Sequence, residues 1–166
     1  MYKIGIIGHT MEDIKNHKED EKMVKNTIDL LAQQYSKDVS FNIAAETGLS
    51  EWAADHCIRT ENNFHLFLPY PLKDAENMLF EYQFNSLKKF YNLAKSITIS
   101  FPYYDKTQKL ELQNYKNLID NSQFLVVFWE GMRQGTVYEA INYALSTHKL
   151  LLDGHNKLTL MTNENL

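Results

Sequence analysis

The residues best placed to do chemistry lie in a loop that follows the apolar run 124–128 and leads into a helical pattern. Gly135 allows the backbone to approach a ligand closely, and Thr136 can cap the following helix while presenting its hydroxyl to a phosphate. Glu139 stands three residues later, one helical turn on, so its carboxylate can point back toward the loop. There it can contact ribose hydroxyls or stabilise a developing oxocarbenium ion, which makes Glu139 the candidate catalytic residue. Further ligand-binding candidates in the same loop are Trp129, Gly131 and Arg133.

A purely structural role explains the same spacing. Thr136 and Glu139 also fit the Ser/Thr-x-x-Glu capping box, in which the two side chains only satisfy free N–H groups at the start of a helix. Because this pattern occurs in many helices, the residues alone leave both interpretations open.

Two other short loops contain glycine and follow apolar runs. Glu46 or His9 can serve as the proton donor to a leaving base if the protein cleaves a glycosidic bond. An aromatic ring can stack on the base, although aromatic residues in such places more often belong to the core. The candidate ligand-binding residues of these loops are Gly8, His9, Thr10, Ala45, Glu46, Thr47 and Gly48, and the stacking candidates are Trp129, Tyr70 and Trp52.

Strand and helix patterns alternate along the chain and must position these loops. Right-handed crossovers between such units produce a single doubly wound, mainly parallel sheet with helices on both faces, a Rossmann-like α/β fold. The three loops then meet outside the carboxyl ends of the strands, where helix N-termini offer free N–H groups. Apolar runs predict strands over 3–8, 41–45, 64–68, 96–100, 124–129 and 150–152. Helical spacing predicts helices over about 20–35, 49–59, 74–95 (in one piece or two), 112–119 and 135–147.

The chain resembles a known group of nucleotide-binding proteins at three places. The segment Gly135-Thr136-x-x-Glu139 resembles the Gly-Gly-x-Gly-Thr-x-x-Glu signature of the LOG proteins, phosphoribohydrolases that release cytokinin bases from their nucleotides. Residues 43–54 resemble the second glycine-rich turn of the wider SLOG superfamily, and residues 120–131 look most like its YpsA-type branch. The resemblance covers roughly 3–153, and we assign 1–153 to one nucleotide-binding domain, with 154–166 as a C-terminal tail.

Several positions depart from the pattern of that superfamily. The paired glycines of the second turn are Ala44 and Ala45 here, and Ser50 replaces an aspartate. Asn114 and Tyr115 stand where the branch commonly has Arg-Asn, so Arg133 becomes the candidate phosphate partner. Gly135-x-x-Tyr138-Glu139 is also similar to an element of nucleoside deoxyribosyltransferases in which the glutamate reacts at the anomeric carbon, which supports a sugar-facing Glu139.

Three functions follow from the resemblance. The first is binding of a nucleotide, with hydrolysis of the N-glycosidic bond of a nucleoside 5′-monophosphate or related nucleotide. The second is a non-catalytic sensor of a nucleotide or ADP-ribose-like signal, and the third is a regulatory partner whose crevice is vestigial. The resemblance also implies a homo-oligomer, with a dimer favoured, whose interface could contain Tyr82, Phe84 and Phe90.

Composition limits the remaining classes. The formal net charge is −4 and no dense Lys/Arg run is present, so we expect no nucleic-acid partner. The start of the chain lacks the zones of a signal peptide, and no apolar run approaches the roughly 20 residues that cross a bilayer, which predicts a cytoplasmic protein with no membrane partner. Cys57 is the single cysteine, and the histidines show no metal-ligand spacing, so we expect no disulfide, no metal site and no cofactor. The histidines outside the loops are His17, His56, His65, His148 and His155.

Overall fold

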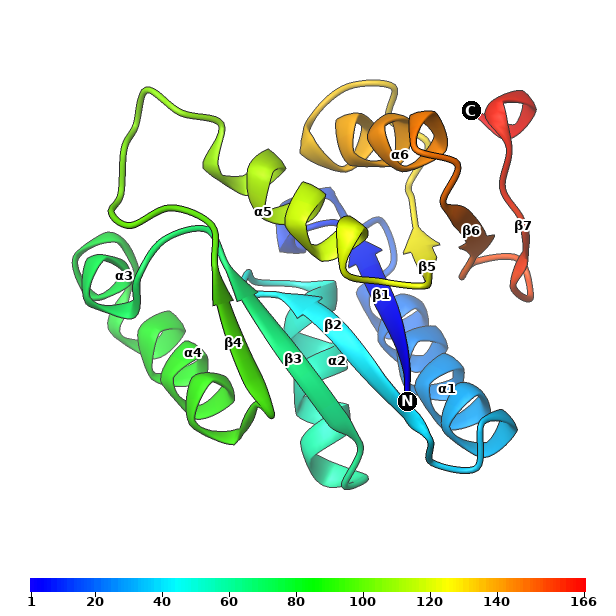
Figure 1. Cartoon of the computed structure of the whole chain (residues 1–166), viewed down its shortest axis with the longest axis horizontal. Coiled ribbons are helices and arrows are strands. Elements are labelled where there is room, and N and C mark those ends of the chain that lie inside the picture. Colours follow the sequence, from blue (N-terminus) through cyan, green and yellow to red (C-terminus); the bar gives the residue numbers. More distant parts are fainter.

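The computed structural model describes all 166 residues and contains one seven-stranded sheet in the order β4-β3-β2-β1-β5-β6-β7 (Figure 1). Strands β1 to β6 run parallel, and β7 is antiparallel to β6. The strands are β1 (Tyr2–Gly8), β2 (Val39–Ala44), β3 (Asn63–Leu68), β4 (Ser96–Ile99), β5 (Phe124–Phe128), β6 (Leu150–Asp153) and β7 (Thr159–Leu160). The helices are α1 (His17–Gln34), α2 (Leu49–Arg59), α3 (Leu72–Met78), α4 (Glu81–Leu93), α5 (Leu110–Asp120) and α6 (Thr136–Ser146), with short 3-10 turns at Met11–Asp13 and Asn163–Asn165.

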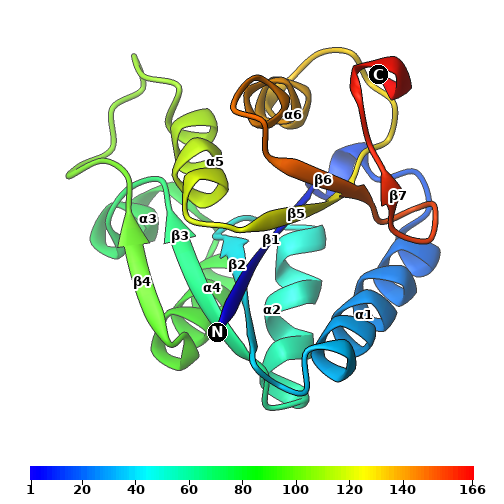
Figure 2. The same ribbon diagram turned by 45° about the vertical axis from the view of Figure 1, so that its right-hand side comes forward.

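Helices cover both faces of this sheet, as the strand patterns predicted. Strands β2 and β5 are buried along their whole length, and the sequence of β5 is accordingly a continuous apolar run. One core of 21 buried residues joins the sheet to α1, α2 and α4, and a second core of 14 joins its other face to α5 and α6 (Figure 2). The doubly wound α/β expectation is therefore confirmed.

The helical stretch predicted over 74–95 is two helices. The backbone is extended at Leu79 and Phe80, which separates α3 from α4. Helix α1 begins earlier than predicted because the side chain of Asn16 accepts a hydrogen bond from the amide of Glu19, 3.2 Å away, and caps the helix.

The strand order reverses direction beside β1. From β1 the chain continues to β2, β3 and β4 on one side, then returns to form β5 and β6 on the other side. In a doubly wound sheet, such a reversal opens a crevice at the carboxyl ends of the two strands that flank it. Those ends are Gly8 and Phe128, which pair with each other in the sheet.

The last thirteen residues pack onto the same sheet. They contain β7, and Met161 is buried in the core beneath α6. The amide of Met161 donates to the carbonyl of Leu151, 3.0 Å away. No helix of the protein has both the length and the apolar character needed to span a bilayer.

Candidate functional site

The loops after β1 and β2 are in direct backbone contact. Gly48 has a φ of +89°, and a Cβ atom built there would lie 2.7 Å from the carbonyl oxygen of His9. The amide of Leu49 donates to the same oxygen across 3.3 Å. Glycine is therefore required at position 48 both for its backbone conformation and for the close approach of the two loops.

A pocket of about 150 Å³ lies at the carboxyl ends of the strands, where the sheet reverses. Six of the predicted site residues line it: Gly8, His9, Thr10, Glu46, Gly135 and Thr136. Six lining residues were not predicted: Asp13, Glu111, Tyr115, Met132, Gln134 and Val137. The three glycine-bearing loops thus gather in one crevice.

Helix α6 begins at this pocket without a side-chain cap. Its N-cap residue is Gly135, with a φ of +91° and open space where a side chain would stand. The capping-box interpretation is therefore wrong, because Thr136 is the first residue of the helix and not its cap. The amides of Thr136, Val137 and Tyr138 have no acceptor within the chain. Free amides at the positive end of a helix dipole favour an anion.

Glu46 is one of three acidic side chains that line the pocket, and its pKa lies near neutral pH. Burial is the main cause that raises its pKa to about 7, and the nearby charge of Glu111 adds to the shift, while the hydroxyls of Tyr115 and Ser50 oppose it. Tyr115, buried on α5, hydrogen-bonds to Glu46 and lies 3.1 Å from the carbonyl oxygen of Gly8. Tyr115, one of the two residues that replace the expected Arg-Asn pair, therefore contacts Glu46 in the loop after β2.

A second, apolar cavity of about 60 Å³ lies on the other side of Glu46. It sits between the end of β2 and helices α2 and α4, and it contains the predicted residues Ala45 and Thr47. Its polar groups include Gln83, Ser86 and the buried hydroxyl of Ser50. Glu46 thus separates a polar pocket from an apolar one.

Glu139 lies outside both pockets. Its side chain is 45% exposed, and its carboxylate is 3.4 Å from the ammonium of Lys109, in the loop before α5. The sequence spacing placed Glu139 correctly in the first turn of α6, but its carboxylate contacts Lys109 on the surface and does not line the pocket.

Three other predicted residues of the β5–α6 loop also lie outside the pocket. The guanidinium of Arg133 donates to the backbone oxygen of Leu166 across 2.9 Å. The indole of Trp129 donates to the carbonyl of Met132, 2.9 Å away, and its ring stacks on Tyr138 at 6.1 Å between centroids. Gly131, with a φ of +86°, serves only the path of the loop.

The other aromatic candidates have structural partners. Trp52 packs against the first core with its ring 6.1 Å from that of His17, and Tyr70 packs edge-on against Tyr104 at 5.2 Å. Phe90 is a core residue, so it cannot form part of an oligomer interface, whereas Tyr82 is 70% exposed.

His9 is buried in the wall of the polar pocket. Its Nε2 accepts a hydrogen bond from the amide of Glu130, 3.0 Å away, and burial lowers the pKa of its imidazole. The geometry therefore fits a neutral ring whose Nε2 carries no proton.

Behind His9 the fold assembles a cluster that the sequence did not reveal. Asp20, Glu130 and His155 direct one ligand atom each toward a common point, with all these atoms within 4.8 Å of one another. These residues are the ones that could hold a metal ion.

Comparison with known proteins shows the fold. No protein-family model matches the sequence, and no curated protein matches it. DNA processing protein A (DprA) from Streptococcus pneumoniae aligns with 92% of this chain at a TM-score of 0.70 and 11% identity, and TM1055, a structural-genomics target, aligns with 91% at 0.60 and 12%. The chain spans 50% of the first protein and 72% of the second. These neighbours show that the chain shares their Rossmann-like α/β fold.

A third structural neighbour corrects the expectation of no nucleic-acid partner. DNA processing protein A from Helicobacter pylori aligns with 99% of this chain and 70% of its own length, at a TM-score of 0.66 and 15% identity, and its structure is described as showing a single-stranded DNA binding mode. The exclusion was wrong because it rested on net charge, which describes the whole surface and not one crevice.

Proposed function

We propose that the polar pocket binds a nucleotide, with its phosphate at the start of α6 and its sugar beside Glu46. The observation that carries this proposal is the pair of free amides of Thr136 and Val137 in the wall of the pocket. Amides at a helix N-terminus bind phosphate without a basic side chain, which fits a pocket whose predicted phosphate partner, Arg133, points elsewhere.

The acidic side chains of the pocket suit a sugar. Asp13, Glu46 and Glu111 supply acceptors for ribose hydroxyls. The proton on Glu46 removes one negative charge near pH 7, so a phosphate is repelled less. The apolar cavity on the far side of Glu46 can take part of a base, with Gln83 and Ser86 available to its polar edge.

Hydrolysis of an N-glycosidic bond is the finer form of this proposal, and it assigns the acid role to Glu46. A protonated carboxyl group between the sugar site and the base site can donate its proton to the departing base. The side chain of Asp13 or Glu111 would face the positive charge that develops at the anomeric carbon and stabilise it. This form of the proposal gives Glu139 no role, because its side chain does not line the pocket.

Single-stranded DNA is the second candidate ligand, since the Helicobacter pylori neighbour is described as binding it. Exposed aromatic rings offer faces on which bases can stack. Phe80 and Tyr82 lie at the start of α4 with their rings stacked at 6.1 Å, and Tyr103 is exposed in the loop after β4. In that case the pocket would hold one nucleotide unit of the strand.

Two substitutions at one position test the phosphate site. Proline is favoured as the first residue of a helix, so Thr136→Pro removes the amide hydrogen and keeps α6. Thr136→Ala is the matched control, since it removes the same hydroxyl and keeps the amide. Affinity for a panel of nucleoside 5′-monophosphates is measured by calorimetry, and affinity for a labelled oligothymidylate of roughly 16 nucleotides by fluorescence anisotropy.

We expect Thr136→Pro to weaken binding by about 10- to 100-fold relative to Thr136→Ala, as for the loss of one hydrogen bond to a charged group. Tight binding of monophosphates identifies a nucleotide site, and binding of the oligonucleotide alone identifies a strand site. Base release that Glu46→Gln abolishes supports hydrolysis. Equal affinity in the proline and alanine variants, or no binding of either ligand, would overturn the proposal.

A further inference from the structure

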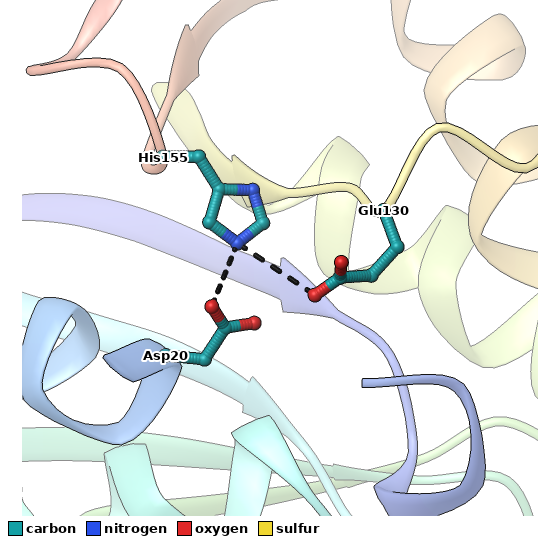
Figure 3. Close-up of side chains that lie close together, drawn as sticks. All are labelled: Asp20, Glu130 and His155. Atoms are coloured by element: carbon teal, nitrogen blue, oxygen red, sulfur yellow. Dashed lines mark hydrogen bonds and ion pairs between the residues drawn. The ribbon is translucent and has the colours of Figure 1, made fainter. Parts of the chain in front are cut away.

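We propose that Asp20, Glu130 and His155 form a binding site for a divalent transition-metal ion of the Zn²⁺ class. The site lies beside the nucleotide pocket and does not depend on the function proposed for that pocket. Figure 3 shows the three side chains directed at one another from α1, the loop after β5 and the turn between β6 and β7.

The spacing of the ligand atoms suits such an ion. His155 Nε2 lies 3.1 Å from Asp20 Oδ1 and 3.8 Å from Glu130 Oε1. Zinc binds nitrogen and carboxylate oxygen at about 2.0–2.2 Å in a tetrahedron, which puts neighbouring ligand atoms roughly 3.4 Å apart. Three protein ligands fill three corners and leave the fourth for water or a substrate.

Burial makes the cluster incomplete without a cation. The side chains of Asp20 and Glu130 are only 6% and 9% exposed. Asp20 Oδ2 and Glu130 Oε1 have no hydrogen-bond partner, and Glu130 Oε1 is the atom that faces the imidazole. Burying two acidic side chains beside a single imidazole is costly in an interior, and a bound cation would offset that cost.

The surroundings hold the ligands in place. The His155 ring stands edge-on to Phe128 at 5.5 Å, and its amide donates to Asp153 Oδ1 across 2.9 Å. The Glu130 backbone is fixed twice, since its amide donates to His9 Nε2 and its carbonyl accepts from Lys15 Nζ, 3.0 Å away. Both of these contacts use the backbone of Glu130. The carboxylate of Glu130 therefore stays free to face His155.

Donor chemistry selects the class of ion. One imidazole with two carboxylates suits Zn²⁺, Mn²⁺ or Fe²⁺, whereas Ca²⁺ needs six to eight oxygen ligands and Mg²⁺ prefers oxygen alone. The Glu130 amide donates to His9, and His9 lines the polar pocket. An ion bound by Glu130 would therefore be connected to that pocket through a single residue, His9.

The test is metal titration of the full chain after treatment with a chelator. Calorimetry with ZnCl₂ measures affinity and stoichiometry, and the visible absorption of bound Co²⁺ reports the geometry of its ligands. The variants are Asp20→Asn and His155→Gln. His17→Gln is the matched control, because His17 is an exposed histidine at the start of α1.

We expect one ion per chain, tetrahedral Co²⁺ bands, and at least tenfold weaker Zn²⁺ binding in both variants but not in the His17→Gln control. We also expect Zn²⁺ to raise the Tm of the wild-type protein and to leave that of Asp20→Asn unchanged. If Asp20→Asn does not fold, His155→Gln decides alone. Unchanged Zn²⁺ binding in His155→Gln, or no saturable binding in the wild-type protein, would overturn the proposal.

Discussion

The hydroxyl of Tyr115 lies between the carboxyl group of Glu46 and the carbonyl oxygen of Gly8, so it links the ends of β1 and β2 through a residue of α5. A hydroxyl has one hydrogen to donate. When Glu46 is protonated it can donate to Tyr115, which in turn donates to Gly8, and every group in the chain is then satisfied. When Glu46 is ionised, Tyr115 must turn to it, and the bond to Gly8 is lost. Protonation of Glu46 thus allows Tyr115 to keep its hydrogen bond to Gly8.

The first prediction concerns stability and pH. The pKa of Glu46 is raised from 4.5 to about 7 by folding, so the folded state binds the proton more tightly than the unfolded state does. The contribution of protonated Glu46 to the free energy of unfolding is complete below pH 4.5 and is lost as the pH rises through about 7. We expect Glu46→Gln, which stays neutral, to gain on the order of 1–3 kcal/mol relative to wild type between pH 5 and pH 8.

Urea denaturation at a series of pH values measures this difference. The Glu139→Gln variant serves as the control, because it makes the same change of side chain at a surface position outside the pocket. A constant difference between wild type and Glu46→Gln would contradict the account of Glu46.

The second prediction concerns the contact between two loops. Gly48→Ala forces a Cβ atom to within 2.7 Å of the His9 carbonyl and also strains a positive φ, so we expect a loss of about 3 kcal/mol or more. Gly131→Ala has a similar φ, with nothing within 4 Å of the new atom, so it should cost only about 1 kcal/mol. Thermal unfolding of the two variants separates backbone strain from steric conflict, and equal losses would refute the close approach.

The third prediction separates the two glutamates of the site. Glu139 contacts Lys109 on the surface, and exposed ion pairs contribute about 0–1 kcal/mol. Glu139→Gln should therefore change nucleotide affinity less than twofold and stability by less than 1 kcal/mol. Glu46→Gln should change the affinity or the rate of base release at pH 8, where the wild-type carboxyl group is ionised and the amide is not. A large loss on Glu139→Gln alone would return the catalytic role to that residue.

The sequence predicted the elements well and the side-chain directions poorly. Apolar periodicity is a local signal, so it located α2 at 49–59 and the strand that became β5 to within one residue. The alternation of strands and helices also predicted that the three glycine loops lie at one edge of the sheet, because the carboxyl ends of parallel strands lie at the same edge. The direction of Glu139 depends on Lys109, thirty residues earlier, and no local pattern contains that contact.

The buried cluster shows the same limit more strongly. Asp20 and His155 are 135 residues apart and meet only because β6 returns beside β5, above the start of α1. No short spacing links them, which is why the histidines looked scattered. Asp20 on an otherwise apolar helix face was the one available signal, since Asp is rarely buried without a partner.

The measurement that tests the central claim most directly is a titration of ¹⁵N-labelled protein with a nucleoside 5′-monophosphate, followed through the amide signals at the start of α6. We predict saturable shifts of the Thr136, Val137 and Tyr138 amides, larger than those of the amides at the start of α4, with an affinity that matches calorimetry. Saturation that moves other signals and leaves these three amides in place would contradict the proposal that this helix holds the phosphate.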